Sequence, residues 1–201
     1  LKLQQQRCLI VGGGHIAYRK ANLLVKAGAI VDVIAPEIIP ELRQLVEQSA
    51  GQYIQTAFSE TILATTYRLV IAATDQPDVN KTVFEQCEAR NILVNSVDDI
   101  PHCRFMVPAI IDRSPLVISV ASNGASPVLS RQLRTQIETI VPHGMGKLAE
   151  FSGQWRKQVK AKIANPDERR IFWENLYASP LKEQVFNDNL DVANGLIEQA
   201  L

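Results

Sequence analysis

The chain has 201 residues, 46% of them hydrophobic, and its 21 basic and 21 acidic side chains give a formal net charge of zero. This length is enough for one medium domain or two small ones around a packed core. The balanced charge argues against broad electrostatic binding to nucleic acid or to an anionic membrane. The sequence also contains no apolar run that approaches the roughly 20 residues needed to span a bilayer.

The cysteines and the start of the chain bear on where the protein works. Cys8, Cys87 and Cys103 form an odd, sparse set without CxxC spacing, which is typical of a reduced protein in the cytoplasm. No charged segment followed by an apolar run opens the chain, so we expect no secretory signal peptide. Residue 1 is leucine rather than methionine, which leaves room for a short leader outside this numbering.

Short apolar runs alternate with helical patterns through the first half of the chain. Apolar runs that end at glycine, proline or polar residues predict strands, and they cover residues 7–12, 29–36, 53–58, 68–75 and 91–98. Apolar residues at helical spacing predict helices between them, and these cover residues 15–28, 41–48 and 79–89. The alternation predicts an α/β fold with a parallel sheet covered by helices on both faces.

The pattern changes near residue 104. Two apolar runs on either side of a "DRSP" turn predict an antiparallel hairpin over residues 104–122. A helix is expected over 126–141, with Ser126 as its N-cap, followed by helices to the end with breaks near 165–168 and 179–182. We therefore expect a Rossmann-type domain at 1–110, a small α+β region at 111–145 and a helical domain at 146–201.

The segment "GGGHIA" after the first predicted strand fills the G-x-G-x-x-G/A pattern of dinucleotide-binding loops. Gly12 permits a tight turn, Gly14 leaves room for a pyrophosphate, and Ala17 lets the helix pack closely on the sheet. The free N–H groups around His15 and Ile16 would face the anion at the positive end of the helix. A glycine turn without a ligand is the alternative, and the flanking strands and helix favour the dinucleotide.

One part of the dinucleotide-binding pattern is missing. The second strand usually ends with an acidic residue that binds the adenosine ribose. Here the strand ends at Ala35 and Pro36, with Glu37 as the nearest carboxylate. Backbone groups at Pro36 and Glu37 are the expected substitute. No arginine follows at once to bind a 2′-phosphate, which favours NAD over NADP.

Two polar segments lie at positions where ligands bind in α/β proteins. Asp98 and Asp99 follow the fifth predicted strand, at the carboxyl edge of the sheet, where a carboxylate could take a proton while a hydride leaves. A solvated loop aspartate is the alternative. The loop "ASNGASP" at residues 121–127 offers hydroxyl, amide and N–H groups at a helix start, which suits a substrate carboxylate or a plain capping loop.

The arginines and the possible metal ligands of the sequence are weaker indications of a binding site. Arg131 and Arg134 follow that loop on the same helix and could meet further carboxylates, although most such arginines are only solvated. Asp, His and Cys lie close together in "DDIPHC", but no second pair of ligands has a recognised spacing, so we expect no permanent metal. His102 and Cys103 are expected to be local packing and surface groups, and His143 part of a hinge.

The sequence resembles the sirohaem synthase dehydrogenase/ferrochelatase module, the precorrin-2 dehydrogenase family. The likeness covers the chain in order and rests on the segments "CLIVGGGHIAYRKANLLVKAGA", "IAATD", "NSVDD", "MVPAIIDRSPLVISVASNGASPVLSRQLR" and "ERRIFWE". It implies a cytoplasmic homodimer that oxidises precorrin-2 to sirohydrochlorin with NAD. It also implies that the region at 111–145 makes dimer contacts, and it leaves open whether Fe²⁺ is then inserted as a second substrate.

The resemblance also implies roles for individual residues. The catalytic aspartate of the family matches Asp98, and a serine that is phosphorylated in some members matches Ser122. Substrate contacts are expected at Ser122, Asn123, Gly124, Ser126 and Arg131. Cofactor contacts are expected at Gly12, Gly13, Gly14, His15, Ile16, Pro36, Glu37, Thr74 and Asp75.

The sequence departs from the family in two respects. His15 stands where relatives often carry a short polar or acidic residue. The methyltransferase domain fused to some relatives is not in this sequence, so, unless the chain was trimmed, methylation of the earlier precursor would fall to a separate protein. A non-catalytic NAD-sensing module and a chelatase without dehydrogenase activity are the alternative functions. The "SNGASP" loop and the helical tail favour the enzyme.

Overall fold

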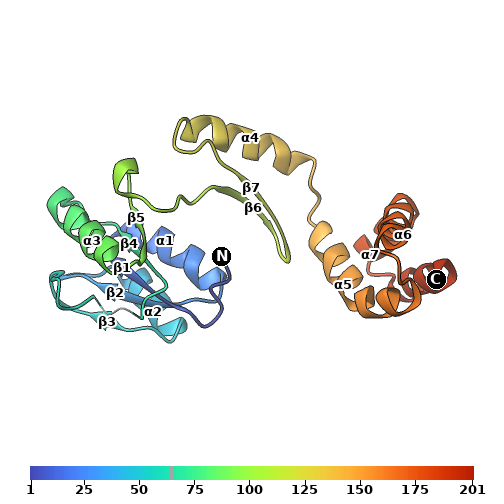
Figure 1. Cartoon of the computed structure of the whole chain (residues 1–201), viewed down its shortest axis with the longest axis horizontal. Helices are drawn as coiled ribbons and strands as arrows, with labels where there is room; N and C mark the ends of the chain where they lie inside the picture. Colours follow the sequence, from blue (N-terminus) through green and yellow to red (C-terminus); the bar gives the residue numbers. More distant parts are fainter. Residues whose placement is uncertain (64–65) are drawn as a thin grey trace. The chain divides into compact units, whose positions relative to one another are not determined.

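The computed structural model describes residues 1–63 and 66–201, which divide into two compact units, Leu1–Val107 and Pro108–Leu201 (Figure 1). We call them unit 1 and unit 2. Unit 1 carries a parallel sheet with helices, and unit 2 carries an antiparallel hairpin followed by helices.

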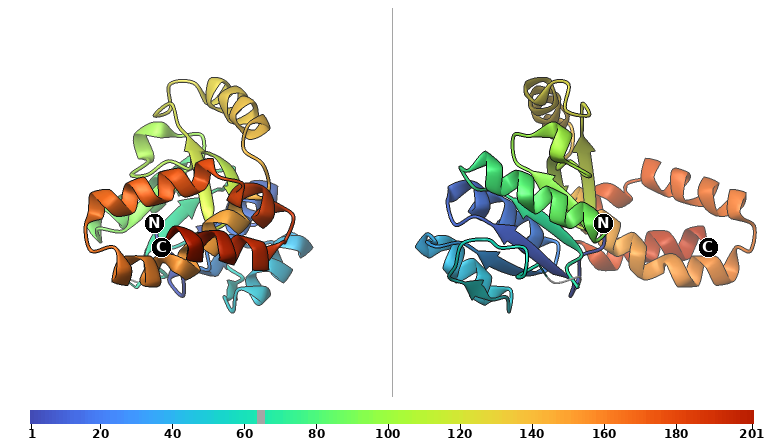
Figure 2. Two further views of the ribbon diagram at one scale, coloured as in Figure 1. Left: turned by 90° about the vertical axis from the view of Figure 1, so that its right-hand side faces the viewer. Right: turned by 60° about the vertical axis from the view of Figure 1, so that its left-hand side comes forward.

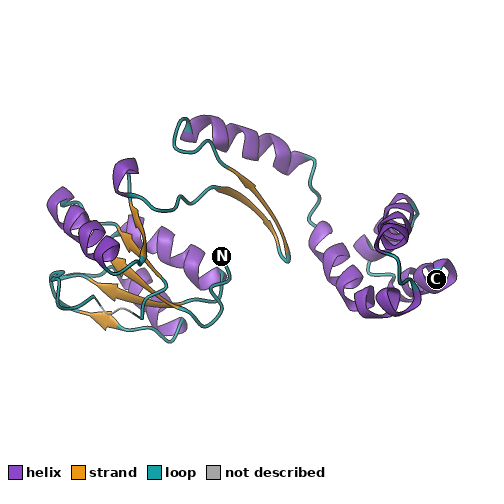
Figure 3. Cartoon of the chain, viewed as in Figure 1, coloured by secondary structure: helices purple, strands orange, loops and turns teal. Residues whose placement is uncertain are grey.

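The sheet of unit 1 has the strand order β3-β2-β1-β4-β5 (Figure 1), and its strands, orange in Figure 3, are parallel. Its strands are β1 (Arg7–Val11), β2 (Ile30–Ile34), β3 (Tyr53–Ile54), β4 (Leu69–Ala72) and β5 (Leu93–Ser96). The connections include α1 (His15–Lys26), α2 (Pro40–Gln48), α3 (Pro77–Ala89) and the short helix η1 (Ile100–His102). The chain leaves β1 toward β2 on one side and reaches β4 on the other, so the order reverses at β1.

The two faces of the sheet are covered separately because successive side chains of a strand point to opposite faces. Ile10 of β1 packs with Ala17 and Ala21 of α1 and with Leu42 of α2 in one buried cluster. Leu9 of β1 belongs to a second cluster, with residues of β4, β5 and α3. The right-hand view of Figure 2 shows α3, in green, lying across one face of the sheet. Each fully buried aliphatic side chain stabilises this arrangement by about 1.5–3 kcal/mol.

Unit 2 begins with a hairpin of β6 (Ala109–Arg113) and β7 (Leu116–Val120), on which α4 (Pro127–Thr139) packs. The peptide bond between Ser114 and Pro115 in its turn is cis. The remaining helices are α5 (Met145–Lys162), α6 (Pro166–Ala178), α7 (Leu181–Phe186) and α8 (Leu190–Ala200), which share one buried apolar cluster. In the described part of the chain, none of the helices has the length and apolar character needed to cross a membrane.

The structure confirms the predicted parallel sheet and differs from the sequence prediction in details. Strand β3 contains only Tyr53 and Ile54, not residues 53–58, because it pairs at the sheet edge through just two positions. The chain also breaks between α7 and α8, where Asp188 has a φ of 59°, at a turn that has no clear signal in the sequence. Apolar side chains of α4 and of its C-cap residue lie partly in solvent, with Leu129 50% and Ile140 76% exposed.

Candidate active site

The glycine loop after β1 is held between the ends of the two neighbouring strands. Gly12 has a φ of 126°, which favours glycine, and a Cβ there would lie 2.4 Å from the carbonyl oxygen of Ala73, just after β4. A Cβ at Gly13 would lie 1.8 Å from the carbonyl oxygen of Glu37, in the loop after β2. Two of the three glycines are therefore required by close backbone packing at the point where the strand order reverses.

Gly14 is different, because a Cβ there would meet no heavy atom within 4 Å. Gly14 is also the N-cap residue of α1, and no side chain caps the first N–H groups of that helix. His15 and Ile16 in its first turn are exposed. Open space in front of uncapped N–H groups at a helix N-terminus fits the pyrophosphate of a dinucleotide. Pyrophosphate binding by Gly14, His15 and Ile16 stays a prediction that this geometry supports.

The end of β2 lies against the glycine loop. The N–H of Ile39 donates to the carbonyl oxygen of Gly13 at 2.9 Å. The hydroxyl of Tyr53 donates to the carbonyl oxygens of Ala35 and Pro36 at 3.0 and 3.2 Å. Since Gln55 also donates to Pro36 at 3.3 Å, that carbonyl oxygen already accepts two hydrogen bonds from the protein.

Thr74 and Asp75 follow β4, on the other side of the glycine loop. Asn80, which is 7% exposed, fixes Thr74: its Oδ1 accepts from the Thr74 hydroxyl at 2.8 Å and from the Thr74 N–H at 3.2 Å. Its Nδ2 donates to the Thr74 carbonyl oxygen at 3.0 Å. Asp75 is exposed. Asn80 was not predicted as a functional residue, because its place in the first turn of α3 has no pattern that shows it reaching back to the strand end.

The loop after β5 is fixed by a network around a cysteine. Asn95 pairs with Cys103 as an isolated antiparallel bridge, and its side-chain Nδ2 donates to the carbonyl oxygen of Phe105 at 2.9 Å. The Cys103 thiol donates to the Ser96 carbonyl oxygen at 3.1 Å. Burial raises the pKa of this thiol, and the bond to the Ser96 backbone opposes the shift. Cys103 therefore has the local packing role predicted for it, and it holds the loop at the end of β5.

Asp98 and Asp99 have different surroundings. The Asp99 carboxylate lies 2.6 Å from Nδ1 of His102, whose ring contacts Phe84 edge-on. Asp98 is exposed, has a φ of 59°, and forms no hydrogen bond or ion pair among residues 1–63 and 66–201. The carboxylate of Asp98 is therefore free to meet a ligand, whereas that of Asp99 is occupied.

Lys20, on the second turn of α1, is the basic group that interacts with Asp98. Its side chain is half-buried, and burial lowers the pKa of its ammonium, while the negative charge of Asp98 raises it in opposition. Lys20, on the helix of the glycine loop, therefore lies within electrostatic range of the Asp98 carboxylate. Lys20 was not predicted as a functional residue, because a lysine on an amphipathic helix has no distinguishing pattern.

The residues expected to bind substrate lie in unit 2. Asn123 and Gly124 have φ values of 54° and 83°, so the chain turns tightly before α4. The Ser122 hydroxyl accepts from the N–H of Ser126 at 3.0 Å, and the Ser126 hydroxyl accepts from an N–H in the first turn of α4 at 3.4 Å. The N-cap predicted at Ser126 is confirmed. Both hydroxyls thus already take part in turn and cap hydrogen bonds.

The two arginines of α4 differ in whether their side chains are already paired within the protein. Arg131 is exposed. Arg134 lies 2.6 Å from Glu138 and also donates to the carbonyl oxygen of Ile110 at 3.1 Å. Arg134 thus helps to fix α4 on the hairpin, and Arg131 is the arginine of α4 that remains available to a ligand.

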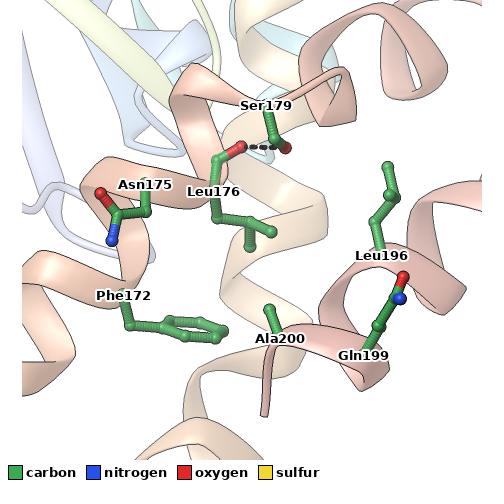
Figure 4. Close-up of a pocket in the computed structure, with 7 residues that line it drawn as sticks. All are labelled: Phe172, Asn175, Leu176, Ser179, Leu196, Gln199 and Ala200. Atoms are coloured by element: carbon green, nitrogen blue, oxygen red, sulfur yellow. Dashed lines mark hydrogen bonds between the residues drawn. The ribbon is translucent and has the colours of Figure 1, made fainter.

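Two other features of the described residues carry no chemistry of their own. No group of three or more His, Cys, Asp or Glu side chains within residues 1–63 and 66–201 is arranged to hold a metal ion. A pocket of about 280 Å³ lies between α6 and α8 (Figure 4), and its lining residues carry no ionisable group: Phe172, Asn175, Leu176, Ser179, Leu196, Gln199 and Ala200.

Residues 1–109 match the family model described as "Putative NAD(P)-binding". The chain belongs to this NAD(P)-binding family. Residues 144–201 match a second model, the sirohaem synthase dimerisation region. The dinucleotide-binding interpretation of the glycine loop thus agrees with the family, and the loop, Thr74 and Asp98 all lie within the matched NAD(P)-binding residues.

Curated relatives extend the comparison over the whole chain. The siroheme synthase of Acinetobacter baylyi is 79% identical over 201 residues, which are all of this chain and 44% of that protein. The siroheme synthase of Chromobacterium violaceum is 45% identical over the same length, which is 43% of that protein. The NAD(P)-binding chain thus spans less than half the length of the curated relatives it matches.

A solved structure shares the fold. The structure of SirC, a precorrin-2 dehydrogenase, superposes with a TM-score of 0.76 at 21% sequence identity, covering 100% of this chain and 96% of that chain. The likeness confirms the predicted succession of parallel sheet, hairpin and helices in the NAD(P)-binding chain.

Proposed function

We propose that the protein oxidises precorrin-2 to sirohydrochlorin, with NAD as the hydride acceptor, in sirohaem biosynthesis. One observation carries the proposal: the open glycine loop follows β1 and the exposed carboxylate of Asp98 follows β5, so both belong to the carboxyl edge of one parallel sheet. The 79% identity to a siroheme synthase and the match to its dimerisation region support the substrate.

The cofactor would be held by the ends of β1, β2 and β4. The first N–H groups of α1, at His15 and Ile16, would bind the pyrophosphate in the space that Gly14 leaves open. When bound, NAD supplies a nicotinamide ring that accepts a hydride. The family description includes both NAD and NADP, and the lack of an arginine directly after β2 is what favours NAD.

Asp98 would act as the general base. Oxidation removes a hydride and a proton from the reduced macrocycle and extends its conjugation, so a proton acceptor is needed beside the hydride acceptor. Asp98 has no hydrogen bond or ion pair to another described residue that would compete for its oxygens.

The many carboxylates of precorrin-2 require local binding groups because the protein has no net charge. We propose that Ser122, Asn123, Gly124 and Ser126 bind one of them through the backbone N–H groups at the start of α4, and that Arg131 binds another. The product could then take up Fe²⁺ as a second substrate at the same site, with no permanent metal in the protein.

The proposal includes a cytoplasmic homodimer, with domains at 1–110, 111–145 and 146–201. Exposed apolar side chains in the middle region support dimer contacts there, and they are Val117 55%, Val128 59%, Leu129 50%, Leu133 40% and Ile140 76% exposed. The match at 144–201 supports a contribution from the helices as well.

The test is anaerobic incubation of the protein with precorrin-2 and NAD⁺, followed by absorption spectroscopy with and without Fe²⁺. Stoichiometric formation of NADH and sirohydrochlorin is expected. Iron insertion without NADH formation would instead indicate a chelatase. NAD binding without turnover of precorrin-2 would indicate the NAD-sensing module, the alternative that the glycine loop alone would also fit.

A further inference from the structure

The end of β2 has a basic group beside it that the sequence did not reveal. The guanidinium of Arg43, in the first half of α2, lies over the ring of Tyr53 at 4.8 Å from the ring centre. The hydroxyl of the same tyrosine donates to the carbonyl oxygens of Ala35 and Pro36. Arg43 therefore packs on the side chain that supports the end of β2, the position where dinucleotide-binding folds contact the adenosine ribose.

No carboxylate pairs with the charge of Arg43 in the described part of the chain. Its side chain is exposed and takes part in no ion pair there, whereas Arg7 and Arg104 of the same unit are paired with Asp32 and Glu88. Stacking on a ring occupies the face of a guanidinium and leaves its N–H edges free to donate. Arg43 can therefore bind an anion without giving up its contact with Tyr53.

The acidic residue that would exclude a 2′-phosphate is missing at the end of β2, where Ala35 and Pro36 stand. Glu37 and Glu41 are the nearby carboxylates in the sequence, and both are exposed. The start of α2 adds a positive helix end, since Ile39 as its N-cap residue forms no side-chain cap hydrogen bond. The charges nearest the ribose position thus include an available cation and solvated acids.

We propose that Arg43 is a specificity-determining residue that lets the cofactor site accept a phosphate on the adenosine 2′-oxygen, so that the protein binds NADP as well as NAD. A guanidinium with two free N–H donors matches the oxygens of a phosphate monoester. The inference rests on the proposed dinucleotide site, and it concerns only the adenosine end of that site.

Calorimetric titration of the protein with NADP⁺ and with NAD⁺ tests the proposal without turnover. Wild-type protein should bind NADP⁺ with an affinity within about tenfold of that for NAD⁺. Arg43→Gln should weaken NADP⁺ binding about tenfold and change NAD⁺ binding less than about twofold, since the lost contact is one exposed charge-assisted pair. Arg43→Lys should retain part of the NADP⁺ affinity.

Arg68→Gln is the matched control, because Arg68 is exposed and directly precedes β4. It therefore lies at the amino ends of the parallel strands, whereas the proposed dinucleotide site lies at their carboxyl ends. Arg68→Gln should leave both affinities unchanged. Equal weakening of NAD⁺ and NADP⁺ by Arg43→Gln would overturn the inference and assign Arg43 a purely structural contact with Tyr53. Wild-type protein that binds NAD⁺ but not NADP⁺ would overturn it too. Failure to bind either nucleotide would overturn the proposed function itself.

Discussion

Substitutions at two neighbouring glycines should have opposite effects, and they test whether the loop is built as we describe. At position 13, an alanine Cβ would lie 1.8 Å from the carbonyl oxygen of Glu37 and 2.9 Å from its carbonyl carbon. Relief requires the backbone after β2 to move by more than an ångström, against the Ile39–Gly13 hydrogen bond. Overpacking costs about 1–3 kcal/mol, and a backbone clash belongs at the upper end. Gly13→Ala should lower the free energy of unfolding of unit 1 by about 3 kcal/mol.

Gly14→Asp should raise the free energy of unfolding, in contrast to Gly13→Ala. Position 14 is the N-cap of α1, and a Cβ there meets nothing within 4 Å. Because aspartate is a better N-cap than glycine, the substitution should stabilise unit 1 by a few tenths of a kcal/mol. The new carboxylate would occupy the pyrophosphate position and repel it, so NAD⁺ binding should fall at least about a hundredfold.

Hydrogen exchange of peptides from β1 and β4, together with calorimetric titration of NAD⁺, separates the two effects. Tryptophan fluorescence would not serve, since Trp155 and Trp173 both lie in unit 2. Wild-type NAD⁺ affinity in Gly14→Asp would show that the loop does not hold the pyrophosphate. Wild-type stability in Gly13→Ala would refute the packing argument.

Three further predictions concern stability. Ser96→Ala should stabilise the protein by about 1 kcal/mol in urea unfolding, because the Ser96 hydroxyl is buried without a partner among the described residues; destabilisation would contradict this. Burial raises the pKa of Cys8 from 9.0 to about 11 and that of Cys87 to about 12, so the folded state keeps both thiols neutral. Their contribution to stability should be complete below about pH 9 and decline as the pH rises toward those folded values; a Cys8→Ala variant should show a shallower decline, and an equal slope would assign it to other groups. Asp32→Asn should cost about 2–3 kcal/mol, since the carboxylate is 2% exposed and accepts from Arg7 at 2.6 Å, and a loss below 1 kcal/mol in urea unfolding would contradict the estimate.

The sequence predicts best where one physical requirement decides the structure. A glycine turn separates the apolar run of β1 from the amphipathic pattern of α1. The predicted limits of both elements therefore agree with the structure to within two residues. Strand β3 was overpredicted, since its two paired residues at the sheet edge have no distinct pattern. The parallel sheet itself follows from the alternation of strands and helices.

The site was less predictable because its selection depends on contacts between distant segments. Spacing alone did not distinguish Asp98 from Asp99, and only the contact of Asp99 with His102 separates a free carboxylate from an occupied one. Arg43 lies six positions after Glu37 in the sequence, so it did not follow the strand directly; helix α2 and Tyr53 bring it back to the strand end. No local sequence pattern predicts that Arg43 lies beside the end of β2.

The most direct test of the central claim measures precorrin-2 oxidation by Asp98→Asn in an anaerobic single turnover with saturating NAD⁺. The substitution keeps the shape of the side chain and removes its ability to accept a proton. We expect the rate of NADH formation to fall about a hundredfold or more, NAD⁺ affinity to stay within about threefold, and the exposed-aspartate control Asp78→Asn to match wild type. Oxidation by Asp98→Asn at the wild-type rate would contradict the assignment of Asp98 as the base.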